Sequence, residues 1–198
     1  LKALEWEKIT RMLAEQTACP DAAEQARALC PETTLEGAGR LLQETDDACL
    51  LTARFGAPSF SGLVNTVNAV RRAESGGVLH PVEFLRMAGV LQAMRNIVRW
   101  RQKGEGIQTT LDGRFAALAP NRYLEERIRA VVLSEEEIAD SASPELSSIR
   151  RKIRSASARV REELDALIRS SVYQKYLQEA IVTQRSGRFV VPVKAECR

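Results

Sequence analysis

The sequence predicts a mainly α-helical protein: a helical bundle with one long lever helix, plus a terminal β-hairpin. Three observations lead to this fold class. Apolar residues recur at intervals of three and four over most of the chain, as they do on the buried face of a helix. Stretches containing Gly and Pro separate these periodic segments and mark the loops between helices. Strand signals, rich in Val, Ile, Thr and Phe, occur only after residue 179.

The helical core bundle is expected over residues 1–142, as helices joined by loops. Pro20 and Pro81 suit the first turn of a helix, where no amide donor is needed. Thr33 and Glu36 have the spacing of a capping box, in which a hydroxyl and a carboxylate satisfy free backbone amides. The predicted helices cover residues 3–18, 20–29, 34–55, 64–74, 81–102, 111–119 and 121–133.

Two of these helices indicate how the bundle packs. The first has a set of apolar residues that we expect to face the core: Leu4, Ile9, Met12 and Leu13. The helix over 81–102 carries two apolar stripes, one around Met87 and one around Ile97, so it should pack on two sides. His80 is the only histidine, and we interpret it as the cap of this helix.

The longest predicted helix is the lever, over residues 143–172. Ser143 can cap its start with its hydroxyl, and Pro144 suits the first helical position. No Gly or Pro interrupts the segment before Ser171, so about 28 residues would extend over roughly 40 Å. Its apolar stripe is narrow, which is typical of a coiled-coil-like seam: Leu146, Ile149, Ile153, Ala156, Val160, Leu164 and Leu167.

Two short strands are predicted after the lever, at residues 180–184 and 188–194. Residues 185–187 between them form a turn, because their glycine readily adopts a positive φ angle. Pro192 has no amide to donate, so the second strand should end near it or lie at an open edge. An isolated hairpin is only marginally stable in water, so we expect residues 173–198 to be the start of a truncated clamp-like domain.

Charge is distributed unevenly along the chain. Residues 1–145 carry 17 basic and 21 acidic side chains, whereas residues 146–198 carry 12 basic and 5 acidic ones. This asymmetry places any polyanion contact on the lever and the hairpin. The candidate contacts are Arg185, Arg188, Lys194, Arg150, Arg154 and Arg161. The alternative, which the residues leave open, is that the Arg-rich helix face is solvated or packs against acidic helices.

Catalytic and metal-binding motifs are missing from the sequence. The one histidine, His80, has no Ser or Cys nucleophile and no carboxylate partner suggested nearby in the sequence, so no Ser-His-Asp set is indicated. Neither HExxH nor the GxxxxGK[ST] phosphate loop occurs. The four cysteines form no CxxC pair, so we expect no metal and no cofactor in this chain. No apolar run approaches the length of a membrane span. We therefore predict a cytoplasmic chain without membrane contact that is not itself an enzyme.

Several motifs resemble the second bacterial subfamily of MutS proteins. The two most specific are YQKYLQE at residues 173–179 and GRFVVPVKAE at residues 187–196. Less specific similarities are DSASPEL at residues 140–146 with Ile149-Arg150, LEW at residues 4–6 and GGVL at residues 76–79. Ala180 is a departure, because the family more often has a proline before the following isoleucine.

This resemblance implies an architecture and a function. Members of the subfamily begin with a helical core and levers, followed by a clamp, a dimeric ATPase and usually a C-terminal Smr nuclease domain. By resemblance, this chain is the core and lever of a homodimer that binds ATP with Mg²⁺. Such proteins bind branched or mismatched DNA and suppress homologous recombination, and some bind ribosomal RNA and split collided ribosomes. Clamp tips close around nucleic acid, so Arg185, Arg188 and Lys194 would contact phosphates without reading sequence.

The alternative hypothesis is a helical interaction or dimerisation scaffold that touches no nucleic acid. The two hypotheses differ in salt dependence, because phosphate binding weakens steeply as salt concentration rises. Branched DNA and ribosomal RNA both offer phosphates, so the sequence does not choose between them.

Overall fold

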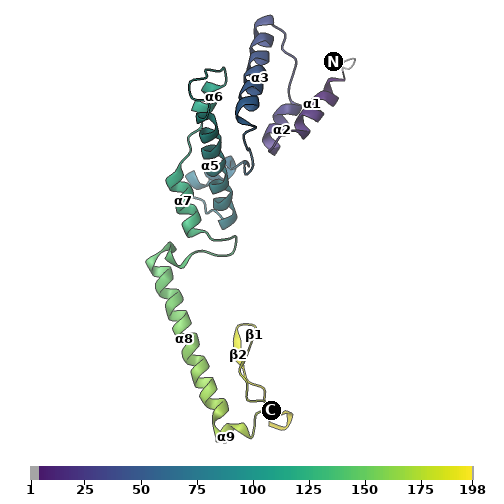
Figure 1. The fold of residues 1–198 in the computed structure, drawn as a ribbon. Helices are drawn as coiled ribbons and strands as arrows, with labels where there is room; N and C mark the ends of the chain where they lie inside the picture. The colour runs from purple at the N-terminus through teal and green to yellow at the C-terminus, as the bar shows by residue number, and fades with distance from the viewer. Residues whose placement is uncertain (1–4, 198) are drawn as a thin grey trace. The chain divides into compact units, whose positions relative to one another are not determined.

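The computed structural model describes residues 5–197, which form two compact units divided between Ala139 and Asp140. The described residues are mainly helical and contain one two-stranded antiparallel sheet (Figure 1). The mainly α fold with a hairpin is therefore confirmed, whereas the predicted division into three parts stays a prediction. Leu4, one of the expected core residues, lies outside the described residues. None of the described helices combines the length and the apolarity needed to cross a membrane.

The described part of the first unit contains α1 (Trp6–Glu15), α2 (Pro20–Arg27), α3 (Leu35–Phe55), α4 (Val67–Glu74), α5 (Pro81–Gln102), α6 (Asp112–Ala116) and α7 (Arg122–Val131). The cap of α3 is Thr34, whose hydroxyl accepts a hydrogen bond from the Gly37 amide at 3.1 Å. The predicted Thr33 cap is wrong by one residue, because the Glu32 carboxylate accepts from the Thr33 amide instead. At α5, His80 occupies the cap position as predicted.

The main apolar cluster lies where α5 and α7 pack together. Ala88 of α5 and Ile128 of α7 are buried there with Val132, which follows α7. A single antiparallel bridge joins Val132 to Ile138, so the chain after α7 folds back over the cluster. Neither predicted stripe of α5 is exposed, which agrees with a helix that packs on two sides.

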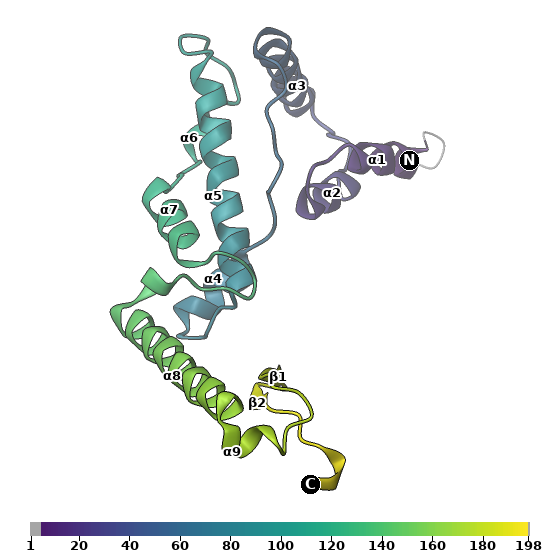
Figure 2. The same cartoon turned by 60° about the horizontal axis from the view of Figure 1, so that its bottom comes forward.

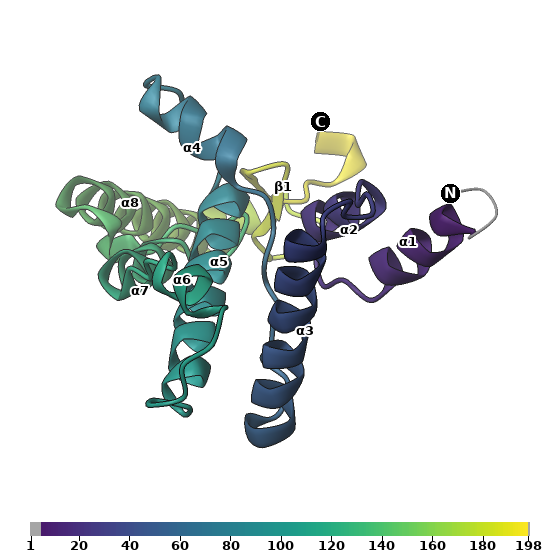
Figure 3. The ribbon, with the colours of Figure 1, turned by 90° about the horizontal axis from the view of Figure 1, so that it is seen from above.

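The packing of α1 differs from the expectation. Its buried residues are Thr10 and Ala14, whereas the predicted core residues Ile9, Met12 and Leu13 are about half exposed. Helices α1 and α2 pack against each other (Figure 3). The residues that they bury are small: Thr10 and Ala14 in α1 and Ala26 in α2. The indole of Trp6 donates a hydrogen bond to the carbonyl of Leu29 at 2.9 Å and holds the end of this pair.

The second unit contains the 3₁₀ turn η2 (Asp140–Ala142), α8 (Pro144–Arg169), α9 (Ser171–Gln174), β1 (Thr183–Arg185), β2 (Arg188–Val190) and the 3₁₀ turn η3 (Ala195–Cys197) (Figure 2). Helix α8 is the predicted lever. Ser143 caps it as expected, since its hydroxyl accepts from the Leu146 amide at 3.1 Å. The lever ends earlier than predicted, because Ser170 adopts an extended conformation and separates α8 from α9.

The hairpin is continued at its base by a second pairing of extended segments. Leu177 and Val193 form an antiparallel bridge, and the Gln178 amide donates to the Pro192 carbonyl at 3.1 Å. Pro192 thus acts only as an acceptor, as its missing amide requires. Both strands are shorter than predicted, and Arg185 belongs to β1 instead of the turn.

Candidate nucleic-acid interface

The tip of the hairpin is a two-residue turn. Ser186 has a φ angle of 48° and Gly187 has one of 75°, the pair of positive values that a type I′ turn requires. Such a turn matches the twist of the flanking strands and sets their register. In this register Arg185 faces Arg188, Gln184 faces Phe189 and Thr183 faces Val190. The turn geometry therefore decides which side chains meet.

Arg185 and Arg188 form a cross-strand pair directly behind the turn. Residues opposite each other in an antiparallel pair point to the same face of the sheet, with their Cβ atoms roughly 5 Å apart. Both residues are exposed. Within the described residues, no carboxylate or carbonyl binds either guanidinium group. Two planar cations that can each bind an anion in bidentate fashion thus share one exposed face.

The two like charges weaken the pairing of the strands. Like charges directly opposite on neighbouring strands destabilise the pairing, and the three residue pairs of this ladder provide little compensation. A phosphate group between the two guanidinium groups would replace repulsion by charge-assisted hydrogen bonds. The geometry of the hairpin tip therefore favours binding of a polyanion.

Lys194 does not belong to this tip. It follows the bridge residue Val193, and its backbone amide donates to the Tyr176 carbonyl at 3.0 Å. Its side chain is only partly exposed. Five residues lie between it and Arg188. The predicted trio of hairpin cations therefore divides into a pair at the tip and a single lysine at the base.

The three lever arginines lie on α8. The Arg150 guanidinium binds one carboxylate oxygen of Asp140 at 2.6 Å, and that of Arg154 binds the other at 3.0 Å. These hydrogen bonds, first from Arg150 and then from Arg154, lower the pKa of Asp140. Arg161 is exposed and no carboxylate of the described chain pairs with it. Two of the three predicted lever contacts are therefore occupied by an acidic residue of their own unit.

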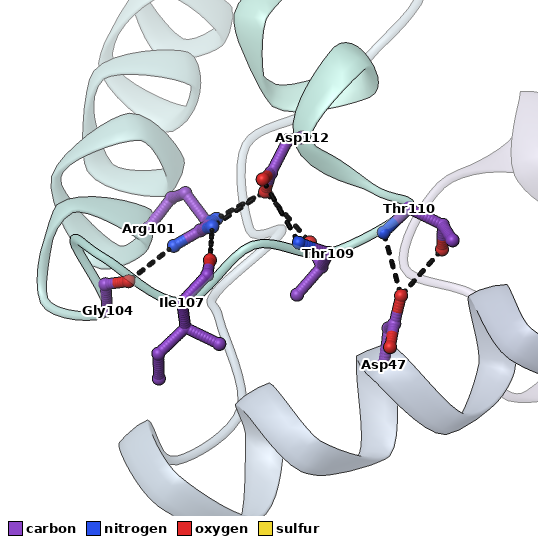
Figure 4. Close-up of polar contacts among 7 residues, drawn as sticks. All are labelled: Asp47, Arg101, Gly104, Ile107, Thr109, Thr110 and Asp112. Atoms are coloured by element: carbon purple, nitrogen blue, oxygen red, sulfur yellow. Dashed lines mark hydrogen bonds and ion pairs between the residues drawn. The ribbon is translucent and has the colours of Figure 1, made fainter.

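A polar network in the first unit was not predicted from the sequence (Figure 4). The Arg101 guanidinium binds the Asp112 carboxylate at 2.6 Å and the Gly104 carbonyl at 2.9 Å, which closes the loop between α5 and α6. Hydrogen bonds from Arg101 lower the pKa of Asp112 to about 2. The Asp47 carboxylate accepts from both the amide and the hydroxyl of Thr110, each at 2.7 Å. This network holds a loop and leaves no unpartnered nucleophile or base.

Metal-binding geometry is also missing from residues 5–197, where no three His, Cys, Asp or Glu side chains come together. All four cysteines are free thiols. The hairpin tip is thus a place where two exposed cations face each other without an acidic partner among the described residues.

The sequence of this chain is similar to those of several known proteins. Endonuclease MutS2 of Acetivibrio thermocellus is 41% identical over 202 residues, which cover all of this chain and 25% of that protein. Endonuclease MutS2 of Ruminiclostridium cellulolyticum is 39% identical over 197 residues, which cover 98% of this chain and 25% of that protein. The protein of the same name from Geobacillus thermodenitrificans is 36% identical, with 100% and 26% covered.

The chain is a MutS2 homologue. The resemblance to the second MutS subfamily is therefore confirmed along the whole chain. The chain spans about a quarter of the length of these MutS2 relatives. No protein-family model matches the chain.

Proposed function

We propose that this chain is the non-catalytic core and lever segment of a MutS2 protein, and that its hairpin tip contacts nucleic acid. The observation that carries the proposal is the cross-strand pair of Arg185 and Arg188, two exposed cations held on one face without an acidic partner. Contacts of guanidinium groups with phosphates position a protein on nucleic acid and carry no sequence information. The hairpin tip would therefore bind branched or mismatched DNA, or ribosomal RNA, by its backbone.

The remaining activities of the proposal belong to polypeptide outside these 198 residues. The relatives carry the name endonuclease, and they are about four times as long as this chain. ATP with Mg²⁺ would bind outside this chain, since its sequence has no GxxxxGK[ST] loop. In this proposal a homodimeric ATPase moves the lever and hairpin, suppresses homologous recombination and, in some relatives, splits collided ribosomes.

The experiment compares charge-matched variants of the full-length protein that contains this chain. Binding to a fluorescein-labelled four-way DNA junction and to a labelled ribosomal RNA helix is measured by anisotropy at low salt. The variant Arg185→Ala/Arg188→Ala should lose at least about tenfold in affinity, because two phosphate contacts disappear. The control Arg11→Ala/Arg99→Ala removes the same charge at exposed positions of α1 and α5 and should bind like the parent protein.

The outcomes distinguish this proposal from the alternative hypothesis, a helical scaffold that touches no nucleic acid. Equal affinities of both variants and the parent protein would exclude the hairpin tip as a contact. Loss of binding to one nucleic acid only would identify which of the two the hairpin contacts.

A further inference from the structure

A hollow of about 450 Å³ opens beside the hairpin tip, within the second unit. Arg185 of the candidate interface forms part of its wall. Thr183 and Val190, which face each other across the two strands, also line it. Further walls come from the chain on both sides of the hairpin, among them Gln178, Glu179, Ile181 and Val193. One of the two exposed arginines at the tip therefore lies at the edge of a hollow.

The alternation of side chains along β1 connects this hollow to the cationic face. Residues two apart in a strand point to the same face, so Thr183 lies on the same face as Arg185, about 7 Å further along the strand. In a nucleic acid, a single sugar joins each phosphate to its base. A nucleotide whose phosphate is bound by Arg185 thus has its base within reach of the hollow.

The side chains around the hollow match the chemistry of a nucleobase. Ile181 and Val193 are 45% and 38% exposed, and the flat face of a base would cover this apolar surface. Gln178 and Glu179 are exposed, and no other residue of the described chain binds their side chains. An amide can donate and accept hydrogen bonds with the edge of a base, and a carboxylate accepts one from the amino group of cytosine.

The base of a paired nucleotide is held away from such a hollow. In a duplex its faces are stacked and its edge is paired, so it would first have to leave the double helix, which costs free energy. A base that is already unpaired, as in a loop, a bulge or a strand end, avoids this cost. The hollow therefore favours unpaired nucleotides, whereas the arginine pair alone would bind any phosphate backbone.

We propose that the hollow binds the base of an unpaired nucleotide whose phosphate is held by Arg185 and Arg188. The inference rests on the proposed function and adds to it the class of nucleotide that the hairpin prefers. Glu179 adds a preference among the bases. Adenine, cytosine and guanine carry an amino group that can donate to its carboxylate, whereas thymine and uracil carry none.

The test measures the binding of labelled single strands to the full-length protein that contains this chain. Three strands of equal length carry cytosine, thymine or no base on every sugar, so they have the same phosphates. The cytosine strand should bind at least about fivefold more tightly than the strand without bases, because contacts with the base are lost. It should bind about threefold more tightly than the thymine strand, because one hydrogen bond to Glu179 is lost. The cytosine strand is made both as DNA and as RNA, and the tighter complex identifies the source of the nucleotide.

Two pairs of matched variants locate the bound base. Ile181→Ala should reduce the preference for the cytosine strand over the strand without bases at least about twofold, because part of the apolar wall is removed. Val172→Ala, at an exposed position of α9 outside the hollow, should keep this preference. Glu179→Ala should abolish the preference for cytosine over thymine. Glu196→Ala removes the same charge at an exposed position outside the hollow and should keep that preference.

Three results would overturn the inference. Equal affinities for the cytosine strand and the strand without bases would exclude a bound base; Arg185→Ala/Arg188→Ala would then still weaken both complexes, and the proposed function would stand. A preference for cytosine that survives both Ile181→Ala and Glu179→Ala would place the base outside the hollow. Unchanged binding of every strand by Arg185→Ala/Arg188→Ala would overturn the proposed function and the inference together.

Discussion

The ion pair between Arg95 of α5 and Glu125 of α7 allows a quantitative test of how the first unit is held together. The two groups bind in bidentate fashion, at 3.0 Å and 2.9 Å. The Glu125 side chain is 5% exposed and that of Arg95 is 25% exposed. Hydrogen bonding from Arg95 lowers the pKa of Glu125 despite its burial. The substitution Glu125→Gln removes the charge and keeps the size of the side chain.

The expected loss in free energy of unfolding is about 2 kcal/mol. Removing one partner of a fully buried pair costs roughly 3–5 kcal/mol, and partial exposure of Arg95 allows water to compensate part of this cost. With a urea dependence of about 2 kcal/mol per molar, the unfolding midpoint should fall by about 1 M. The assay is urea unfolding of the 198-residue chain, followed by circular dichroism at pH 7.

Glu126→Gln is the matched control, because Glu126 is the next residue of α7 and is paired with Arg122 in an exposed i,i+4 ion pair. Such pairs contribute about 0.5 kcal/mol or less. Equal midpoints for the two variants, within the error of the fit, would refute the assignment of a stabilising α5–α7 ion pair. The pKa of Glu125 is lowered, so its stabilisation is present above the usual value of 4.5 and is lost as pH falls through the lower folded value.

Two further predictions concern the first unit. Leu51 of α3 is fully buried, so Leu51→Ala should lower the free energy of unfolding, measured in urea, by about 3 kcal/mol. Leu42→Ala changes an exposed position of α3 and should have little effect. Equal effects of the two substitutions would contradict the burial of Leu51. Asp112 has a pKa of about 2, so its stabilisation is present above the usual value of 3.8 and is lost as pH falls through about 2. The stability difference between the parent chain and Asp112→Asn should therefore be constant from pH 7 to about 4 and shrink toward pH 2, and a difference that disappears near pH 4 would contradict this.

Local signals were sufficient to predict the lever. Ser143 specifies the start of α8 through a side-chain cap, and Pro144 suits a position that needs no amide donor. The cap contact and the position of the proline are both confirmed. The end was harder to predict, because Ser170 carries no strong breaking signal. Its extended conformation ends α8 at Arg169, three residues before the predicted end at residue 172.

The hairpin was predicted from sequence patterns, but its register was not. A turn at residues 185–187 and flanking strands were predicted, but a shift of one residue in a turn changes which side chains face each other. The positive φ angles of Ser186 and Gly187 set the register that brings Arg185 opposite Arg188. Arg185 and Arg188 could therefore be proposed from the sequence, whereas their position opposite each other could not.

Contacts between segments that are distant in the sequence could not be predicted either. Arg95 and Glu125 are 30 positions apart, and nothing in either helix indicates that they meet. Ile9, Met12 and Leu13 were predicted to be buried but are about half exposed. An apolar stripe predicts that a helix face is buried, but it does not show which other element covers that face.

The salt dependence of nucleic-acid binding tests the central claim most directly. For the full-length protein, the logarithm of the affinity for a four-way DNA junction is measured against the logarithm of salt concentration, with the parent and with Arg185→Ala/Arg188→Ala. Each lost phosphate contact should reduce the slope by about 0.9, so the slope should fall by roughly 2 for each chain in contact. Slopes and affinities that coincide for the two proteins would contradict a phosphate contact at the hairpin tip.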